Sequence, residues 1–105
     1  MQLYGLKTCD TCRTALKLLG QVEFFDVRDQ GIPVEILMKA YAQFNGALIN
    51  TRSTTWHRLK ESQRKVPPTT LLMEHPTIMK RPLIVDGIQL YLGWNKDVRA
   101  AFGIS

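Results

Sequence analysis

The chain has few of the features that mark membrane, secreted or disulfide-stabilised proteins. No run among its 105 residues approaches the ~20 consecutive apolar residues that a membrane-spanning helix needs. The first residues, MQLYGLKTCD, lack the basic segment and the following apolar segment of a secretory signal peptide. Cysteine is also scarce, because the chain contains only two. We therefore expect a cytoplasmic protein that does not associate with membranes, in which the cysteines serve redox, catalytic or metal chemistry.

Histidine and excess basic charge are too sparse to indicate a zinc site or a nucleic-acid-binding surface. The only histidines, His57 and His75, lack the close spacing of zinc-finger ligands, so no metal site is predicted. The formal net charge is +5, from 14 Lys and Arg against 9 Asp and Glu, and the basic residues are scattered along the chain. This excess favours small anionic partners but does not indicate nucleic-acid binding.

The sequence does contain alternating strand-like and helix-like segments, and its length suits one domain over residues 1–105. Apolar runs bounded by turn residues predict strands, and apolar residues at spacings of three and four predict helices. The predicted order is a strand at 3–6, a helix at 10–19, a strand at 22–27, a helix at 33–44, short helices at 53–59 and 69–74, a hairpin at 81–93 and a helix at 95–102. Residues 28–33 are predicted to form a loop, and Pro67 and Pro68 to break the chain between helices.

This order predicts an α/β protein on the thioredoxin-like plan, a mixed four-stranded sheet flanked by helices. The first strand, helix and strand should form a parallel unit with a right-handed crossover. The hairpin adds antiparallel strands, and Asp86-Gly87 is a dipeptide that a type I′ turn prefers. A C-x-x-C motif between the first strand and the first helix is typical of the same plan.

The C-x-x-C motif, Cys9 to Cys12, is the candidate site of chemistry. Cys9 precedes the predicted helix, where unpaired backbone N–H groups and the helix dipole favour a thiolate. Cys12 lies about one turn inside the helix, where it should be more buried. We therefore predict that Cys9 attacks a disulfide and that Cys12 resolves the mixed disulfide. Lys7 is expected to add positive charge near Cys9, and Asp10 to oppose it. The alternative is that Cys12 is only a small core residue.

Four sequence blocks, in order along nearly the whole chain, resemble a known family. They are LYGLKTCDTCRTAL near the N-terminus, NTRSTTW at 50–56, IMKRPLIVDG at 78–87 and LGWNKD at 92–97. Together they resemble the arsenate reductase family in its broad sense, which includes the ArsC arsenate reductases, the Spx transcription regulators and the small YffB-like proteins. The short chain and the CDT sequence are most similar to the YffB-like branch.

The resemblance implies a thioredoxin-like fold with a helical insertion before the C-terminal hairpin, and it implies roles for residues far from the cysteines. It implies that Cys9 is the reactive cysteine and that Arg52 and Arg81 are anion-binding residues of the catalytic site. It also implies a cis-proline at Pro82, facing the active cysteine. Arsenate reductases carry a third arginine after the hairpin, whereas the nearest counterpart here is Gly93, which argues against arsenate as the substrate. The predicted substrate-binding residues are Lys7, Asp10, Thr11, Pro82 and Gly93.

The function expected from this resemblance is that of a cytosolic thiol-dependent reductase. It would hold no bound cofactor and would use glutathione, or another small thiol or anionic substrate, as its partner. The alternative is an Spx-like regulator, in which a disulfide between Cys9 and Cys12 switches the binding of RNA polymerase. Spx proteins carry more chain beyond the last shared block, so the short C-terminal segment here favours the reductase.

Overall fold

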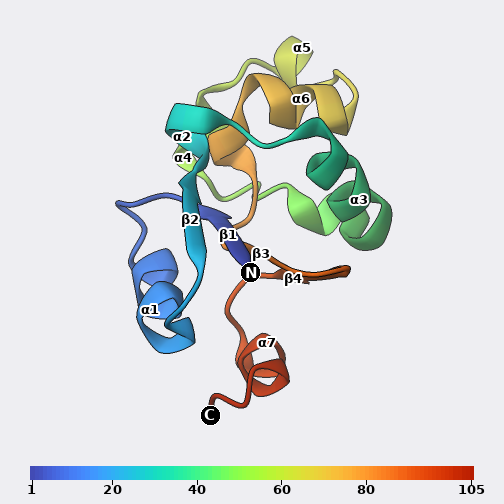
Figure 1. Cartoon of the computed structure of the whole chain (residues 1–105). Coiled ribbons are helices and arrows are strands. Elements are labelled where there is room, and N and C mark those ends of the chain that lie inside the picture. The colour runs from blue at the N-terminus through green and yellow to red at the C-terminus, as the bar shows by residue number, and fades with distance from the viewer. The chain divides into compact units, whose positions relative to one another are not determined.

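The computed structural model describes all 105 residues, which fold into two compact units (Figure 1). The first unit combines residues 1–27 with residues 81–105, and the second comprises residues 28–80. The sheet-bearing unit contains β1 (Gln2–Gly5), α1 (Asp10–Leu19), β2 (Glu23–Asp26), β3 (Leu83–Asp86), β4 (Gln89–Leu92) and α7 (Lys96–Ala101). Between β2 and β3 run α2 (Val27–Gln30), α3 (Val34–Phe44), η1 (Asn45–Leu48), α4 (Thr54–Arg58), α5 (Glu61–Arg64), α6 (Pro68–Glu74) and η2 (Pro76–Ile78).

The sheet confirms the predicted α/β plan of a mixed four-stranded sheet with flanking helices. Its strand order is β2-β1-β3-β4. β1 and β2 are parallel and are joined through α1, whereas β3 pairs antiparallel with both β1 and β4. The helical insertion also falls where it is predicted, between the second strand and the hairpin. The prediction of a single domain over residues 1–105 stays a prediction.

α1 covers one face of the sheet and occupies the residues that the sequence predicts. Its inner side buries Cys12 and Ala15 completely, and they pack with Leu3 of β1 and Ile84 of β3. The helix ends at Gly20, whose φ of 79° is a left-handed conformation that glycine adopts without strain. Since Leu3 and Ile84 belong to the two central strands, this packing anchors the start of α1 to the middle of the sheet.

The hairpin turn lies one residue later than the sequence predicts. Asp86 is the last residue of β3 and pairs with Gln89, so the two loop residues are Gly87 and Ile88. Gly87 has a φ of 61°, whereas Ile88 is not among the residues with positive φ. Positive φ at the first loop residue alone is the pattern of a type II′ turn, so the predicted type I′ turn at Asp86-Gly87 is wrong.

The inserted segment contains more helix than the sequence predicts. The predicted loop at 28–33 begins instead with the last residues of α2, and η1, α5 and η2 lie where no helix is predicted. The two prolines that were predicted to separate helices also start one: Pro67 is the N-cap of α6, and Pro68 is its first residue. Proline fits this position because a first-turn N–H has no helical partner. The other short helices are single turns, which leave little periodicity to read in the sequence.

Candidate active site

Cys9 lies immediately before α1, at the end of the loop that follows β1. Its φ and ψ of −88° and 119° are extended, which makes it the N-cap residue of α1. The Cys9 amide donates to the Leu6 carbonyl at 3.0 Å, and the Cys9 carbonyl accepts from the Arg13 amide at 3.0 Å. The side chain is half-buried, and neither cysteine is in a disulfide. The structure therefore places Cys9 at the helix start, as predicted.

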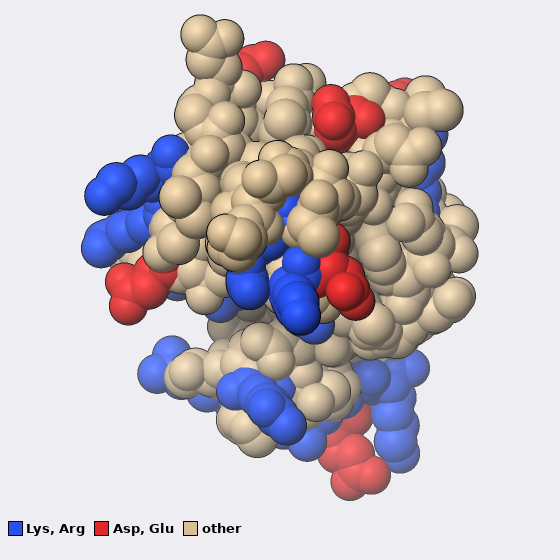
Figure 2. Space-filling model, turned by 90° about the horizontal axis from the view of Figure 1, so that it is seen from below, with Lys and Arg blue, Asp and Glu red and all other residues tan.

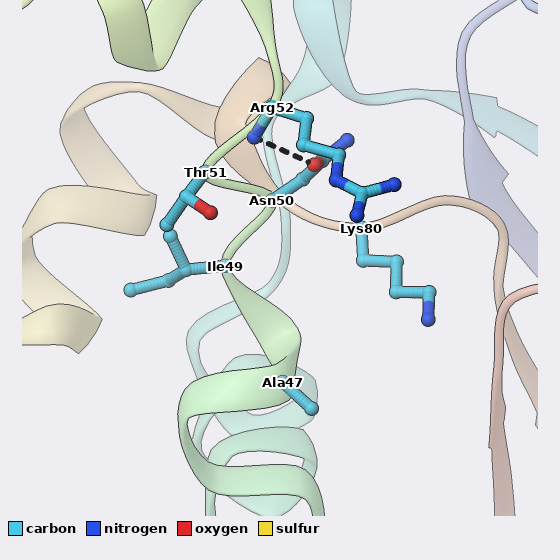
Figure 3. A pocket seen from close by; sticks show the side chains of 6 residues that line it. All are labelled: Ala47, Ile49, Asn50, Thr51, Arg52 and Lys80. Atoms are coloured by element: carbon cyan, nitrogen blue, oxygen red, sulfur yellow. Dashed lines mark hydrogen bonds between the residues drawn. The ribbon is translucent and has the colours of Figure 1, made fainter.

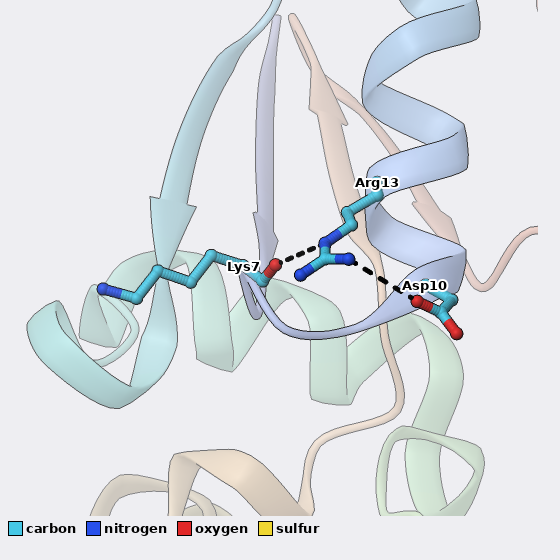
Figure 4. A network of polar contacts seen from close by, with 3 residues as sticks. All are labelled: Lys7, Asp10 and Arg13. Carbon is cyan, nitrogen blue, oxygen red and sulfur yellow. Dashed lines mark hydrogen bonds and ion pairs between the residues drawn. The ribbon is translucent and has the colours of Figure 1, made fainter.

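The surroundings of the Cys9 sulfur favour its thiolate. Burial raises the pKa of Cys9, but the backbone amide and the thiol of Cys12 and the guanidinium of Arg81 lower it, and the net shift is downward. Lys7 and Asp10 are not among the causes of this shift, in contrast to the prediction. The Lys7 side chain extends away from the start of α1 (Figure 4), and the Asp10 side chain is 98% exposed, where water screens its charge.

The surroundings of Cys12, in contrast to those of Cys9, favour the protonated thiol. It is completely buried, and this loss of hydration raises the pKa of Cys12 to about 12. The neighbouring Cys9 sulfur contributes to this rise by charge and hydrogen bonding, and together with burial it outweighs the Leu6 backbone hydrogen bond and the Arg81 charge, which lower the pKa. At neutral pH the two cysteines are thus chemically unequal, with Cys9 as the more acidic thiol and Cys12 protonated.

Gly5, the last residue of β1, leaves the space that Cys12 occupies. A Cβ atom built on Gly5 would overlap the Cys12 Sγ atom, and would also stand 3.3 Å from Cys12 Cβ and from a methyl carbon of Leu3. Any larger residue at position 5 would therefore push the first turn of α1 away from the strand. The missing side chain at Gly5 is what lets Cys12 lie directly against the sheet.

The loop between β1 and α1 is held by two side chains that the sequence did not single out, Asp26 and Arg13, and Figure 4 draws the contacts of Arg13. The Asp26 carboxylate, buried at the end of β2, accepts a hydrogen bond from the Lys7 amide at 3.0 Å. Arg13, in the first turns of α1, donates from Nε to the Lys7 carbonyl at 2.8 Å, and its guanidinium lies 3.8 Å from the Asp10 carboxylate. Both peptide groups of Lys7 are thus fixed, and the loop leading to Cys9 is held from two sides.

Pro82 and Gly93 face each other across the hairpin. The Arg81–Pro82 peptide bond is cis, as the family resemblance implies. The Gly93 amide donates to the Pro82 carbonyl at 2.8 Å, so this amide is engaged within the hairpin. Gly93 is also buried and has a φ of 83°, which explains a glycine here on structural grounds alone. Substrate binding by Pro82 and Gly93 stays a prediction, as it does for Thr11, which is exposed at the start of α1.

Arg52 belongs to the inserted unit of residues 28–80 and not to the sheet-bearing unit. It lines a pocket there with Lys80 and four neighbouring residues (Figure 3). Its amide donates to the Asn50 side-chain oxygen at 3.0 Å, and its guanidinium is exposed. The structure therefore brings Cys9, Cys12 and Arg81 together within one unit and sets Arg52 in a pocket of the other.

The rest of the chain shows no sign of a metal centre or a membrane span. No group of three His, Cys, Asp or Glu side chains is arranged to hold a metal ion. None of the helices combines the length and the apolar character that crossing a bilayer requires. On the face drawn in Figure 2, Lys and Arg side chains form several separate groups with Asp and Glu among them. That face thus carries no single continuous basic patch.

The fold and the site together define a thioredoxin-like protein with an acidic cysteine at a helix N-terminus beside an arginine and a cis-proline. The ArsC family model matches residues 4–102, and the chain belongs to the ArsC family. This confirms the resemblance found in the sequence.

Individual relatives agree with this assignment. An uncharacterised protein of Haemophilus influenzae is 38% identical over 95% of this chain and 96% of its own. The global transcriptional regulator Spx of Bacillus subtilis is 28% identical over 90% of this chain and 80% of its own. Among solved structures, the YFFB protein has a TM-score of 0.82 at 28% identity, covering 95% of this chain and 96% of its own. An arsenate reductase from Vibrio cholerae, with a TM-score of 0.72, is only 19% identical over 100% of this chain and 98% of its own chain, so it supports the fold alone.

Family membership and the cysteine site together support a thiol-based reductase in the broad sense.

Proposed function

We propose that this protein is a glutathione-dependent thiol reductase that acts through the Cys9 thiolate. The observation that carries the proposal is the inequality of the two thiols: the pKa of Cys9 is lowered beside Arg81, whereas burial raises the pKa of Cys12 to about 12. A thiolate is the nucleophile in thiol–disulfide exchange, so only Cys9 is ready to attack at neutral pH. Arg81 both favours that thiolate and, as a guanidinium, suits the anionic groups of a glutathione-like substrate.

The proposed reaction starts from a disulfide between glutathione and a substrate thiol. The Cys9 thiolate bonds to the glutathione sulfur, the substrate–glutathione disulfide breaks, and the substrate leaves as a thiolate. A second glutathione thiolate then attacks the Cys9-bound glutathione, which forms oxidised glutathione and restores the Cys9 thiolate. The net reaction converts one substrate–glutathione disulfide and one glutathione thiol into one substrate thiol and one molecule of oxidised glutathione.

Cys12 offers a second route for resolving the mixed disulfide. Once Cys9 is bound to glutathione, its negative charge is gone, and this removes one cause of the raised pKa of Cys12. Cys12 could then attack Cys9, release glutathione and form a Cys9–Cys12 disulfide. Its complete burial opposes this route, because the thiol must lose its proton away from water.

Intact mass after incubation with oxidised glutathione tests the proposal. In Cys12→Ser we expect one glutathione adduct, located on Cys9 by peptide mapping, because the resolving thiol is absent. In Cys9→Ser, the matched variant, we expect no adduct because the remaining thiol is buried and protonated. Absence of the adduct in Cys12→Ser, or an adduct on Cys12 in Cys9→Ser, would contradict the proposed role of Cys9.

An Spx-like redox regulator is the second candidate function. The observations that favour it are the paired cysteines and the 28% identity to Spx of Bacillus subtilis. In this case a Cys9–Cys12 disulfide would switch binding to RNA polymerase. Capture of polymerase from lysate by the oxidised protein but not by the reduced protein, together with no glutathione adduct, would favour regulation over reduction.

A further inference from the structure

The junction between α3 and η1 holds an asparagine in a backbone conformation that residues with side chains rarely adopt. Asn45 follows the last residue of α3 and has a φ of 51° and a ψ of −133°. It is the only residue other than glycine with a positive φ. The next residue is Gly46, and both residues are exposed. Because glycine has no Cβ atom, its main-chain nitrogen is easily approached by the side-chain amide of the asparagine before it.

The value of ψ at Asn45 brings these two groups together. Around the Cα–C bond of an L-residue, Cβ is displaced from the main-chain nitrogen such that a ψ of about −120° sets the next nitrogen directly beside Cβ. The ψ of −133° lies within about 15° of this alignment. Rotation about the Cα–Cβ bond of Asn45 then suffices to bring its side-chain carbonyl carbon to the Gly46 nitrogen.

The folded chain holds this conformation from both sides. The Asn45 amide donates to the Tyr41 carbonyl in the last turn of α3. The Gly46 carbonyl accepts from the Ile49 amide at 3.2 Å, and Leu48 in the same turn is completely buried. An unfolded chain visits such a combination of φ and ψ only seldom, because it lies in a sparsely populated region. Folding therefore supplies in advance the geometry that joins the two groups.

The other two asparagines of the chain lack these features. The Asn50 side-chain oxygen accepts from the Arg52 amide at 3.0 Å, and the Asn95 side-chain oxygen accepts from the Val98 amide at 2.9 Å. Asn95 also has a ψ of 178°, far from the alignment seen at Asn45. Each is followed by a residue with a side chain, which crowds the main-chain nitrogen. Both asparagines therefore serve as internal comparisons for Asn45.

We propose that Asn45 is a site of spontaneous modification, at which the side-chain amide is converted by water to aspartate and isoaspartate through a succinimide. The Gly46 nitrogen bonds to the side-chain carbonyl carbon of Asn45, and the bond from that carbon to the side-chain nitrogen breaks. The proton of the Gly46 amide leaves with this nitrogen, as ammonia. Water then opens the ring: cleavage of the new bond gives aspartate, and cleavage of the original peptide bond gives isoaspartate. Water is the only co-reactant, and nothing is oxidised or reduced.

The modification would change the inserted unit in two ways. It places a negative charge at the C-terminal end of α3, where the helix dipole is already negative. The isoaspartate product also adds one carbon to the main chain at the start of η1, which displaces the closely packed Leu48. We therefore expect the modified protein to be less stable. This consequence does not depend on the proposed thiol chemistry.

Peptide mapping of the full chain during storage at mildly alkaline pH tests the site. In the native protein we expect conversion at Asn45, with isoaspartate among the products, and none at Asn50 or Asn95 over the same period. Conversion at Asn45 should be about tenfold faster in the native protein than in guanidinium chloride, the rate equivalent of about 1.4 kcal/mol of conformational cost already met by folding. Earlier conversion of Asn50 or Asn95, products without isoaspartate, or a native rate at or below the denatured rate would overturn the proposal.

Thermal unfolding tests the effect on the inserted unit. The isoaspartate form is separated by ion exchange and compared with the unmodified protein and with Asn45→Asp, which adds the charge without lengthening the main chain. We expect Asn45→Asp to lower the Tm by a few degrees, and the isoaspartate form to lower it further. The variant Asn45→Gln, which cannot form a succinimide, should lose the modification. An isoaspartate form as stable as the unmodified protein would refute the predicted displacement of Leu48.

Discussion

The contact between Gly5 and Cys12 gives a stability prediction that can be tested without knowing the substrate. An alanine at position 5 would overlap the Cys12 sulfur, and overpacking of this kind costs about 1–3 kcal/mol. Alanine also lowers the conformational entropy of the unfolded chain, which stabilises the folded protein by about 0.4–1 kcal/mol. We therefore expect Gly5→Ala to lower the free energy of unfolding by about 1.3 kcal/mol, the difference between the midpoints of these two ranges.

Removing the sulfur should remove most of this cost. Cys12→Ala alone should destabilise by roughly 1 kcal/mol, because it deletes one buried heavy atom. In the double variant the new methyl group enters the space left by the sulfur. Its nearest remaining neighbours, the β-carbon at position 12 and the Leu3 methyl, stand at 3.3 Å and need to move only slightly. The double-mutant cycle should thus show a favourable coupling of about 1–2 kcal/mol.

Urea denaturation under reducing conditions measures all four proteins of the cycle. Gly46→Ala is the matched control, since a Cβ at Gly46 would meet no atom within 4 Å and its φ is not positive. This control should be neutral or slightly stabilising. The reasoning fails if Gly5→Ala is as stable as the wild type, or if the two single costs add to within about 0.5 kcal/mol in the double variant.

The thiols, the loop before α1 and the hairpin can each be tested directly. Because a lowered pKa keeps Cys9 ionised as the pH falls, whereas Cys12 titrates at about 12, iodoacetamide at neutral pH should modify one thiol, located on Cys9 by mass spectrometry; equal labelling of both would contradict this. Arg81→Gln should move the pH midpoint of Cys9 alkylation upward, and an unchanged midpoint would show that Arg81 does not stabilise the thiolate. Asp26→Ala leaves the Lys7 amide without this acceptor and should lower the free energy of unfolding by about 1–3 kcal/mol in urea, so full stability would refute its role in holding the loop. Gly93→Ala places a side chain at a φ of 83° and should destabilise by about 1 kcal/mol or more, which thermal unfolding would detect as a lower Tm.

The sequence predicted well those parts of the fold that local patterns control. The ten residues of α1 show a regular apolar spacing with a glycine at the end, and both boundaries agree with the structure. The sequence-based predictions were wrong or incomplete where several local backbone conformations have similar energies. The hairpin turn lies at Gly87-Ile88 and not at Asp86-Gly87, because the pairing of β3 with β4 sets the register. The single-turn helices α2 and α5 are too short to show a periodic pattern in the sequence.

Some residues of the candidate site were likewise indicated by the sequence, and others became evident only in the structure. The sequence indicated Cys9 because its position before a helix can be read from spacing alone, and the family resemblance supplied Arg52, Arg81 and the cis bond at Pro82. The contributions of Asp26 and Arg13 went unnoticed, because each acts on the peptide groups of Lys7 through contacts that spacing does not show.

The sequence by itself determined the class of fold and the helix that follows Cys9, and it predicted Cys9 as the attacking thiol. These follow from short-range periodicity and from the electrostatics of a helix end, which need no distant residue. Only the tertiary structure decided how different the two thiols are, because the burial of Cys12 depends on the empty side-chain position at Gly5 and the pKa of Cys9 depends on Arg81. It also decided that Lys80 shares a pocket with Arg52, since strand-like pairing joins segments that are far apart in the chain.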